Sequence, residues 1–150
     1  MHRLDPNEYL RRRTRILDAM PEGSALLVPT NPERNRSNDT DYRFRPASDF
    51  YYLCGFPEPN AWALLRKGLE GPSFVLFVQP KDPEREVWTG IRSGVTGAVE
   101  DYGADAAHSV EEISSKLGPL IEPAERLFFS FGHQPEHEPQ ITEVLRKLRR

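Results

Sequence analysis

Short apolar runs alternate along the chain with segments whose apolar residues recur at helical spacing. The runs fall at residues 24–28, 61–66, 74–79 and 126–131, and their length is typical of buried strands. Helices are predicted over residues 6–20, 48–55 and 96–102, and from Ser109 and Pro139 onward. Strands that alternate with helices predict an α/β domain with a mostly mixed β-sheet, flanked by helices on both faces.

The first helix has the clearest boundaries. Asp5 is positioned to cap it, Pro6 suits its first position, and Glu8 completes a capping box. Pro21 and Gly23 follow its last turn, and both residues end helices. The sequence therefore fixes this element at both ends.

Two later helices are predicted from capping and from periodicity. Ser109 with Glu112 forms a second capping box. Apolar residues then face inward from each helix: Val110, Ile113 and Leu117 in the first, and Ile141, Val144, Leu145 and Leu148 in the last.

Residues 48–56 read S-D-F-Y-Y-L-C-G-F, an unusually aromatic stretch. Ser48 is predicted to cap one or two helical turns that end at Gly55 in the left-handed conformation. Phe50, Leu53 and Phe56 share one helical face and are predicted to lie in the core. The two tyrosines between them, Tyr51 and Tyr52, leave the helix in other directions, so at least one should be partly exposed.

Trp88 lies in the segment E-V-W-T-G-I-R-S-G at 86–94, which we predict to be a strand end running into a loop. If Val87 points inward on an extended segment, Trp88 points outward. The alternative is that Trp88 packs in the core beside Val87, as large aromatics often do.

Composition narrows the class of protein further. The chain has 150 residues, a net charge of −3 and a single cysteine, Cys54, which excludes an internal disulfide. The amino terminus has no apolar stretch suited to a signal peptide, and eighteen apolar residues never run together. We therefore expect a single, cytoplasmic domain. Because the last predicted helix runs to Arg150 without a cap, we also expect the chain to be a piece of a longer protein.

Three motifs suggest chemistry that their context does not support. His133 to His137 (H-Q-P-E-H) matches a zinc-peptidase pattern, but Pro135 and Pro139 oppose the helix that this pattern needs. A solvated loop is the favoured interpretation. The segment 39–41 (D-T-D) lacks the glycine and the glutamate of a calcium loop. The segment 34–45 interleaves arginines with aromatics as single-strand binders do, but its aspartates and the acidic chain argue against nucleic acid.

Longer blocks of sequence resemble a known family. R-N-R-S-N-D-T-D-Y-R-F-R-P-A-S-D-F-Y-Y-L-C-G-F-P-E-P-N-A (34–61) is similar to the signature of the N-terminal domain of Xaa-Pro aminopeptidases, also called aminopeptidase P. The blocks 86–94, 97–105 and 8–27 resemble other parts of the same domain, in the same order. Prolidase and creatinase share this pair of domains with looser versions of the motifs.

The resemblance implies a non-catalytic domain that precedes a metal-dependent catalytic one. In the family, the second domain holds two divalent metals, usually manganese, and removes the first residue from peptides whose second residue is proline. We therefore expect no catalytic residue and no metal site in these 150 residues, which would serve subunit assembly and closure of the substrate cleft. A stand-alone protein-interaction module and the N-terminal domain of a prolidase are the alternatives.

The implied partners are the protein's own or a neighbouring catalytic domain, a second copy in a homo-oligomer, and a peptide substrate, without nucleic acid or membrane. Exposed aromatics and arginines are typical of such contacts. The candidate residues for the substrate cleft or interface are Trp88, Arg92, Tyr51, Tyr52, Arg43 and Arg45.

Overall fold

The computed structural model describes residues 3–32, 44–131 and 135–148, and its centre is a five-stranded mixed sheet. The strands are β1 (Ser24–Pro29), β2 (Trp62–Lys67), β3 (Phe74–Val78), β4 (Ala106–Ser109) and β5 (Arg126–Phe128). They lie in the order β4-β3-β2-β1-β5. The central pairs β1/β2 and β2/β3 are antiparallel, and the outer pairs β3/β4 and β1/β5 are parallel.

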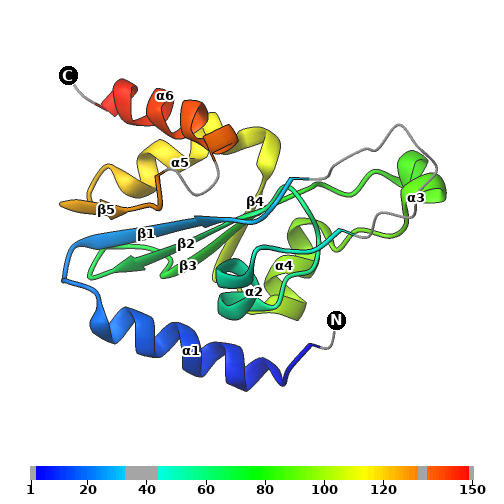
Figure 1. Ribbon diagram of the computed structural model, residues 1–150, viewed down its shortest axis with the longest axis horizontal. Helices are drawn as coiled ribbons and strands as arrows, with labels where there is room; N and C mark the ends of the chain where they lie inside the picture. Colours follow the sequence, from blue (N-terminus) through cyan, green and yellow to red (C-terminus); the bar gives the residue numbers. More distant parts are fainter. Residues whose placement is uncertain (1–2, 33–43, 132–134, 149–150) are drawn as a thin grey trace.

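Helices cover both faces of this sheet, which confirms the predicted architecture (Figure 1). The helices are α1 (Pro6–Ala19), α2 (Ser48–Cys54), α3 (Pro83–Thr89), α4 (Gly94–Tyr102), α5 (Ile113–Ile121) and α6 (Glu138–Leu148). Two 3₁₀ turns, η1 (Val110–Glu112) and η2 (Pro135–His137), precede α5 and α6. One face carries α1, α2 and α4, the other carries α5 and α6, and α3 stands apart from both.

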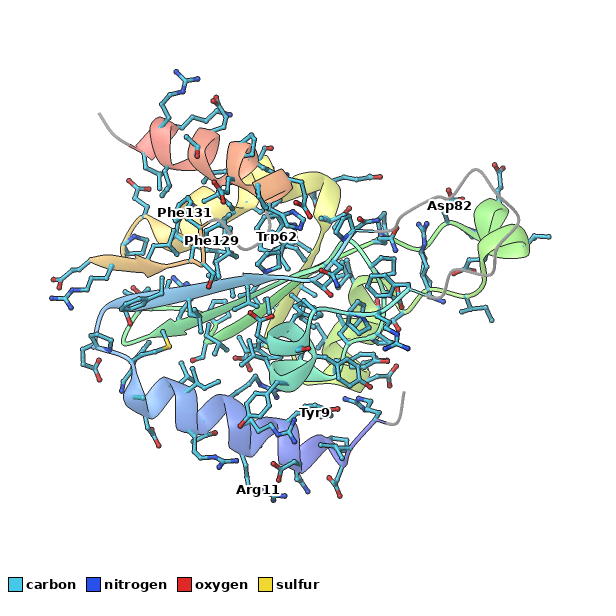
Figure 2. The ribbon with its side chains drawn as sticks, in the orientation of Figure 1. Tyr9, Arg11, Trp62, Asp82, Phe129 and Phe131 are labelled. Atoms are coloured by element: carbon cyan, nitrogen blue, oxygen red, sulfur yellow. The ribbon has the colours of Figure 1, made fainter. Side chains whose placement is uncertain are left out.

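The α5/α6 core fills one face of the sheet. Alternate residues of β1 and β2, among them Leu27 and Trp62, point into it because successive strand side chains face opposite sides. Trp62 is almost fully buried and stacks on Phe129, with 6.4 Å between the ring centroids (Figure 2). The predicted inward residues Ile113, Leu117, Ile141 and Val144 are buried here.

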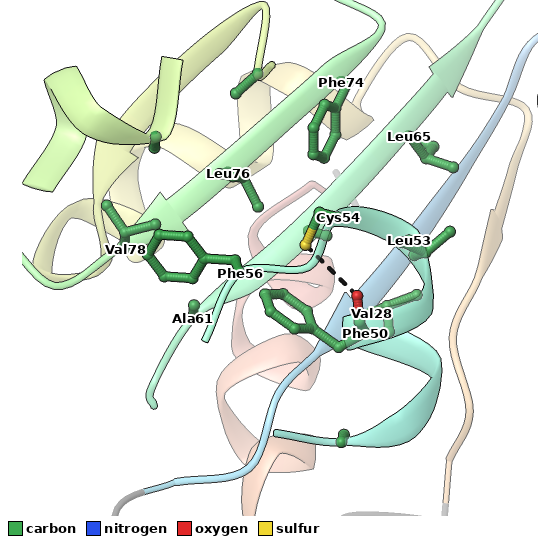
Figure 3. Close-up of a cluster of buried hydrophobic side chains, with 14 of the residues drawn as sticks. Val28, Phe50, Leu53, Cys54, Phe56, Ala61, Leu65, Phe74, Leu76 and Val78 are labelled. Carbon is green, nitrogen blue, oxygen red and sulfur yellow. Dashed lines mark hydrogen bonds between the residues drawn. The ribbon is translucent and has the colours of Figure 1, made fainter. Parts of the chain in front are cut away.

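The α1/α2/α4 core fills the other face, and Figure 3 shows it from close by. Phe50, Leu53 and Phe56 are buried in it as predicted. Burying a side chain such as Phe50 stabilises the fold by about 1.5–3 kcal/mol. The Cys54 thiol donates to the carbonyl oxygen of Phe50 at 3.4 Å, and burial raises its pKa to about 12, so the thiol stays protonated at neutral pH.

The helix boundaries differ from prediction in how they are capped. Asp5 caps α1 through the backbone N–H of Asn7 at 2.8 Å, but the Glu8 carboxylate is bound by Arg11 and Arg12 instead of completing a capping box. Ser48 is the first residue of α2, and Ala47 occupies the cap without a side-chain hydrogen bond. Gly55 ends α2 in the left-handed region, at φ +66°, as predicted.

Three segments differ from prediction in structure. The predicted buried strand 126–131 is paired only over Arg126–Phe128, at a sheet edge where Phe128 is 41% and Phe131 58% exposed. β4 was not predicted, because Ala106–Ser109 is small and polar. The segment around Trp88 is helix α3 and not a strand end.

Candidate interaction surface

Residues 80–93 connect β3 to α4 and carry helix α3 away from the sheet; we call them the α3 arm (Figure 1). The helix begins after Asp82, whose carbonyl oxygen accepts from the backbone N–H of Glu86 at 3.0 Å. Pro83 takes the first helical position, and Glu84 and Glu86 place negative charge in the first turn. This is the same Asp-Pro start as in α1, and it was the sequence signal for a helix here.

The Glu86 side chain connects the two segments of the α3 arm that precede and follow helix α3. Its Oε1 accepts from the backbone N–H of Arg92 at 3.1 Å and lies 4.0 Å from the Nζ of Lys81. Arg92 Nη1 adds a hydrogen bond to the carbonyl oxygen of Pro80 at 3.3 Å. The arm is therefore closed at its base by its own residues.

Two apolar side chains of the α3 arm face outward. Val87 is 80% exposed and Ile91 84% exposed, the highest values among the described large hydrophobic residues. The premise that Val87 points inward from an extended segment is therefore wrong, because the segment is helical and strand alternation does not apply to it. The side chain of Trp88 and the whole of Arg43 lie outside the described residues.

We expect Glu86→Ala to loosen the α3 arm without unfolding the domain, because the contacts it removes lie within the arm. Trypsin cleavage after Arg92 should quicken about 10-fold, since local opening exposes the backbone to proteases. Glu84→Ala is the matched control, because Glu84 is exposed in the same helical turn. Equal cleavage rates in the two variants, at equal melting temperature, would contradict the role of Glu86.

A depression of about 360 Å³ lies between the arm base and α4. Lys81 and Arg92 line it on the arm side, and Glu100 and Asp101 on the α4 side. Beside it, the Oε2 of Glu58 accepts from the backbone N–H of Ser93 at 2.8 Å. Glu58 follows the aromatic stretch 48–56 and thus links that part of the chain to the arm, a contact that no local sequence pattern predicts.

The two candidate tyrosines of α2 lie against α1. Tyr52 is exposed, and the guanidinium of Arg12 lies 4.3 Å from its ring centroid. Tyr51 is half-buried and meets Tyr9 edge to face at 6.3 Å, and burial raises its pKa. One tyrosine is thus exposed, as predicted.

The remaining candidates occupy different places. Arg45 is exposed, and its carbonyl oxygen accepts from the side-chain amide of Asn31 at 2.9 Å. Arg92 is half-buried at the arm base. Figure 1 shows α2 beside α1 and α4, while α3 lies at the far end of the molecule, so the tyrosines of α2 are separated from the α3 arm.

His137, from the zinc-peptidase pattern, is the last residue of η2 and is buried against Thr30, which follows β1. Its Nε2 lies 3.2 Å from the carbonyl oxygen of Thr30, and its ring meets Trp62 edge to face at 4.8 Å. The expectation of a solvated loop is therefore wrong for this residue, although His133 and the segment 39–41 lie outside the described residues. Over the described ranges, no three His, Cys, Asp or Glu side chains are grouped to hold a metal ion.

Burial lowers the pKa of His137, while the Thr30 carbonyl and Glu136 raise it in part. A histidine whose folded pKa is lowered stabilises the fold above its unfolded pKa of about 6.5, and this stability is lost as the pH falls toward the folded value. We expect His137→Gln to remove this part of the pH dependence of stability. Urea unfolding at pH 8 and pH 5.5 measures it, and parallel pH profiles of the variant and the wild type would contradict the assignment.

Known proteins of one family are similar to this chain in sequence. A family model described as the aminopeptidase P N-terminal domain matches residues 9–128. The Xaa-Pro aminopeptidase of Haemophilus influenzae is 38% identical over 136 residues, 91% of this chain and 31% of that protein. That of Escherichia coli is 34% identical over 151 residues, 100% of this chain and 34% of that protein. The chain belongs to the aminopeptidase P N-terminal domain family.

Solved structures of aminopeptidases have the same fold as this chain. An aminopeptidase of Pseudomonas aeruginosa superposes with a TM-score of 0.92 at 37% identity, over 98% of this chain and 33% of that one. Aminopeptidase P of E. coli gives 0.92 at 33% identity, over 99% and 34%. The chain thus spans about a third of the length of these relatives. Among the helices that the structure describes, none is long and apolar enough to cross a membrane.

Proposed function

We propose that this chain is the amino-terminal, non-catalytic domain of a Xaa-Pro aminopeptidase, which removes the first residue from peptides whose second residue is proline. One observation carries the proposal. Almost the whole chain superposes on aminopeptidase structures with a TM-score of 0.92 but accounts for only about a third of each. A catalytic domain that follows residue 150 would supply the remainder.

In this proposal, the metals of the enzyme are bound by the catalytic domain that follows residue 150. The described residues of this chain do not fit them, because they form no group of three His, Cys, Asp or Glu side chains. One similar structure is described as a zinc-substituted E. coli aminopeptidase P in complex with product, which supports a divalent metal in that enzyme. We propose two divalent ions, manganese, in the domain beyond residue 150, and a cytoplasmic location for the whole protein.

Within the enzyme, we propose that this domain serves subunit assembly and closure of the substrate cleft. The α3 arm supports the proposal: it stands away from the body, presents Val87 and Ile91 to solvent, and carries Trp88 and Arg92. Aromatic and arginine side chains are the residues that contribute most at protein interfaces. Its partner would be the catalytic domain of the same or a neighbouring subunit, with Tyr51, Tyr52, Arg43 and Arg45 as further contact candidates.

The test compares the complete product of the reading frame with residues 1–150 alone. We expect the complete product to cleave Xaa-Pro peptides only with added Mn²⁺, and residues 1–150 to cleave none. Calorimetric titration of the short chain with Mn²⁺ or Zn²⁺ should show no tight binding. Cleavage of Xaa-Pro dipeptides alone would identify a prolidase instead, and a reading frame that ends at residue 150 would identify a stand-alone interaction module.

A further inference from the structure

The segment P-E-P-N at 57–60, between α2 and β2, contacts the chain at both ends of the α3 arm. Glu58 binds the end of the arm, because its Oε2 accepts from the backbone N–H of Ser93 at 2.8 Å. Asn60 binds the residue before its start, because its side-chain amide donates to the Oε1 of Gln79 at 3.4 Å. The P-E-P-N segment is therefore placed where the chain leaves the body of the domain and where it returns.

The backbone of the P-E-P-N segment is itself restrained. Pro57 and Pro59 fix their own φ angles, and Pro59 also disfavours the helical region for Glu58. Among the described residues other than glycine, only Asn60 has a positive φ, at +61°, and such residues occur where the surrounding structure holds them and often at functional sites. The Asn60 N–H donates to the carbonyl oxygen of Asn31 at 3.2 Å, which continues the β1/β2 pairing. Glu58 is thus carried by a stiff support.

The second carboxylate oxygen of Glu58 gives the fold no further support. Its Oε1 is buried and has no hydrogen-bond partner among the described residues. A buried polar atom without a partner lowers stability, and the cost is larger for a charged group. The bond to Ser93 is therefore offset by the unpaired oxygen, so the fold gains little net stability from Glu58. Unpaired buried groups in native proteins call for another explanation, and a role in function is one.

Two carboxylates bind consecutive N–H groups at the end of the α3 arm. Glu86, within the arm, accepts from the N–H of Arg92, and Glu58, outside it, accepts from the N–H of Ser93. Glu86 therefore maintains the shape of the arm, and Glu58 attaches the arm to the body of the domain. Figure 1 shows the arm standing away from the sheet, so a small rotation at Ser93 moves α3 by a larger distance.

We propose that Glu58 is a positioning residue for the substrate cleft: it holds the α3 arm at one angle to the sheet and so sets where Trp88 lies relative to the catalytic domain. The inference rests on the proposed function, in which the arm takes part in closing the cleft. Glu58 touches no substrate and acts through the arm. If the arm swings freely, only a fraction of the molecules has a closed cleft, and the apparent affinity for peptide falls by that fraction.

Steady-state kinetics of the complete product test the proposal. Glu58→Ala should raise KM for an Xaa-Pro peptide about 10-fold and leave kcat nearly unchanged, because a saturating peptide selects the molecules with the arm in place. Glu58→Gln keeps an oxygen acceptor of the same reach and should recover most of the affinity. Glu70→Ala is the matched control, because Glu70 is exposed between β2 and β3, at the other end of β2 from Glu58. An unchanged KM in Glu58→Ala would overturn the proposal.

Two further measurements separate positioning from a structural role. In a Trp88→Ala background, Glu58→Ala should raise KM no further, because the arm no longer carries the group that Glu58 positions; effects that multiply would overturn the proposal. The melting temperature of Glu58→Ala should stay near that of the wild type, since the variant removes the unpaired oxygen together with the bond to Ser93. A melting temperature lower by several degrees, with KM unchanged, would assign Glu58 to stability alone.

Hydrogen exchange distinguishes this inference from the proposed function. In the complete product, Glu58→Ala should speed exchange of the Ser93 amide about 10-fold, because that amide loses its acceptor, and leave residues 106–109 of β4 unchanged. Unchanged exchange at Ser93 would overturn the inference, as would Xaa-Pro cleavage with a normal KM in the variant. Faster exchange at Ser93 in a product that cleaves no Xaa-Pro peptide would overturn the proposed function and leave Glu58 as the residue that holds the arm.

Discussion

Replacing Gly55 with alanine should lower the free energy of unfolding by about 3 kcal/mol, the sum of backbone strain and overpacking in a closed core. Gly55 has φ +66°, where a side chain costs about 1–2 kcal/mol. A Cβ atom there would also lie 2.5 Å from the Cζ of Tyr9. The Tyr9 ring has little room to move, because Tyr9 is 1% exposed and the guanidinium groups of Arg3 and Arg12 lie 5.5 Å and 5.4 Å from its ring centroid.

Gly23→Ala is the control that separates the two causes. Gly23 has a similar φ of +77°, but the nearest atoms to an added Cβ are side-chain atoms of Glu125 at 3.8 Å, an ordinary contact. It should therefore lose only about 1–2 kcal/mol, the strain alone. Urea unfolding of the two variants measures the difference. Equal losses would show that Tyr9 yields to the new side chain and that only the backbone conformation matters.

The strands and helices that sequence reasoning predicted are those whose signals are local. Short apolar runs predicted β1, β2 and β3, and the Asp-Pro start predicted α1, because burial and capping leave residue patterns within one element. β4 leaves no such pattern, since Ala106 to Ser109 is small and polar and pairs with β3 only through the tertiary fold. The burial expected at Phe128 and Phe131 depends on a covering layer that a strand cannot specify by itself.

The candidate surface was harder to predict than the fold for a related reason. The residues around Trp88 were interpreted as a strand end with alternating side chains, although proline, here Pro83, is favoured at the first helical position. The α3 arm is closed by contacts of the Glu86 carboxylate with Arg92 and with Lys81, neither of which is adjacent to Glu86 along the chain. The spacing of these residues along the chain predicts neither contact. Sequence reasoning therefore identified Arg92 as a candidate interface residue but did not identify Glu86.

Trp88→Ala in the complete enzyme tests the proposed role of the α3 arm. If Trp88 reaches a substrate site, the variant should lose about 2 kcal/mol of transition-state binding, roughly a 30-fold lower kcat/KM on Xaa-Pro peptides. Its melting temperature should hardly change, because the base of the arm is held by contacts of Glu86 with Arg92 and Lys81, and not by the sheet.

Two further variants show whether the loss belongs to the indole. Trp88→Phe should recover most of the activity, since it keeps a rigid apolar face for a proline-containing peptide. Glu84→Ala changes an exposed polar residue in the first turn of the same helix and should leave kcat/KM nearly unchanged. If Trp88→Ala instead lowers the melting temperature by several degrees, while activity and oligomeric state stay as in the wild type, then Trp88 is a core residue. The arm would then have no part in the substrate cleft.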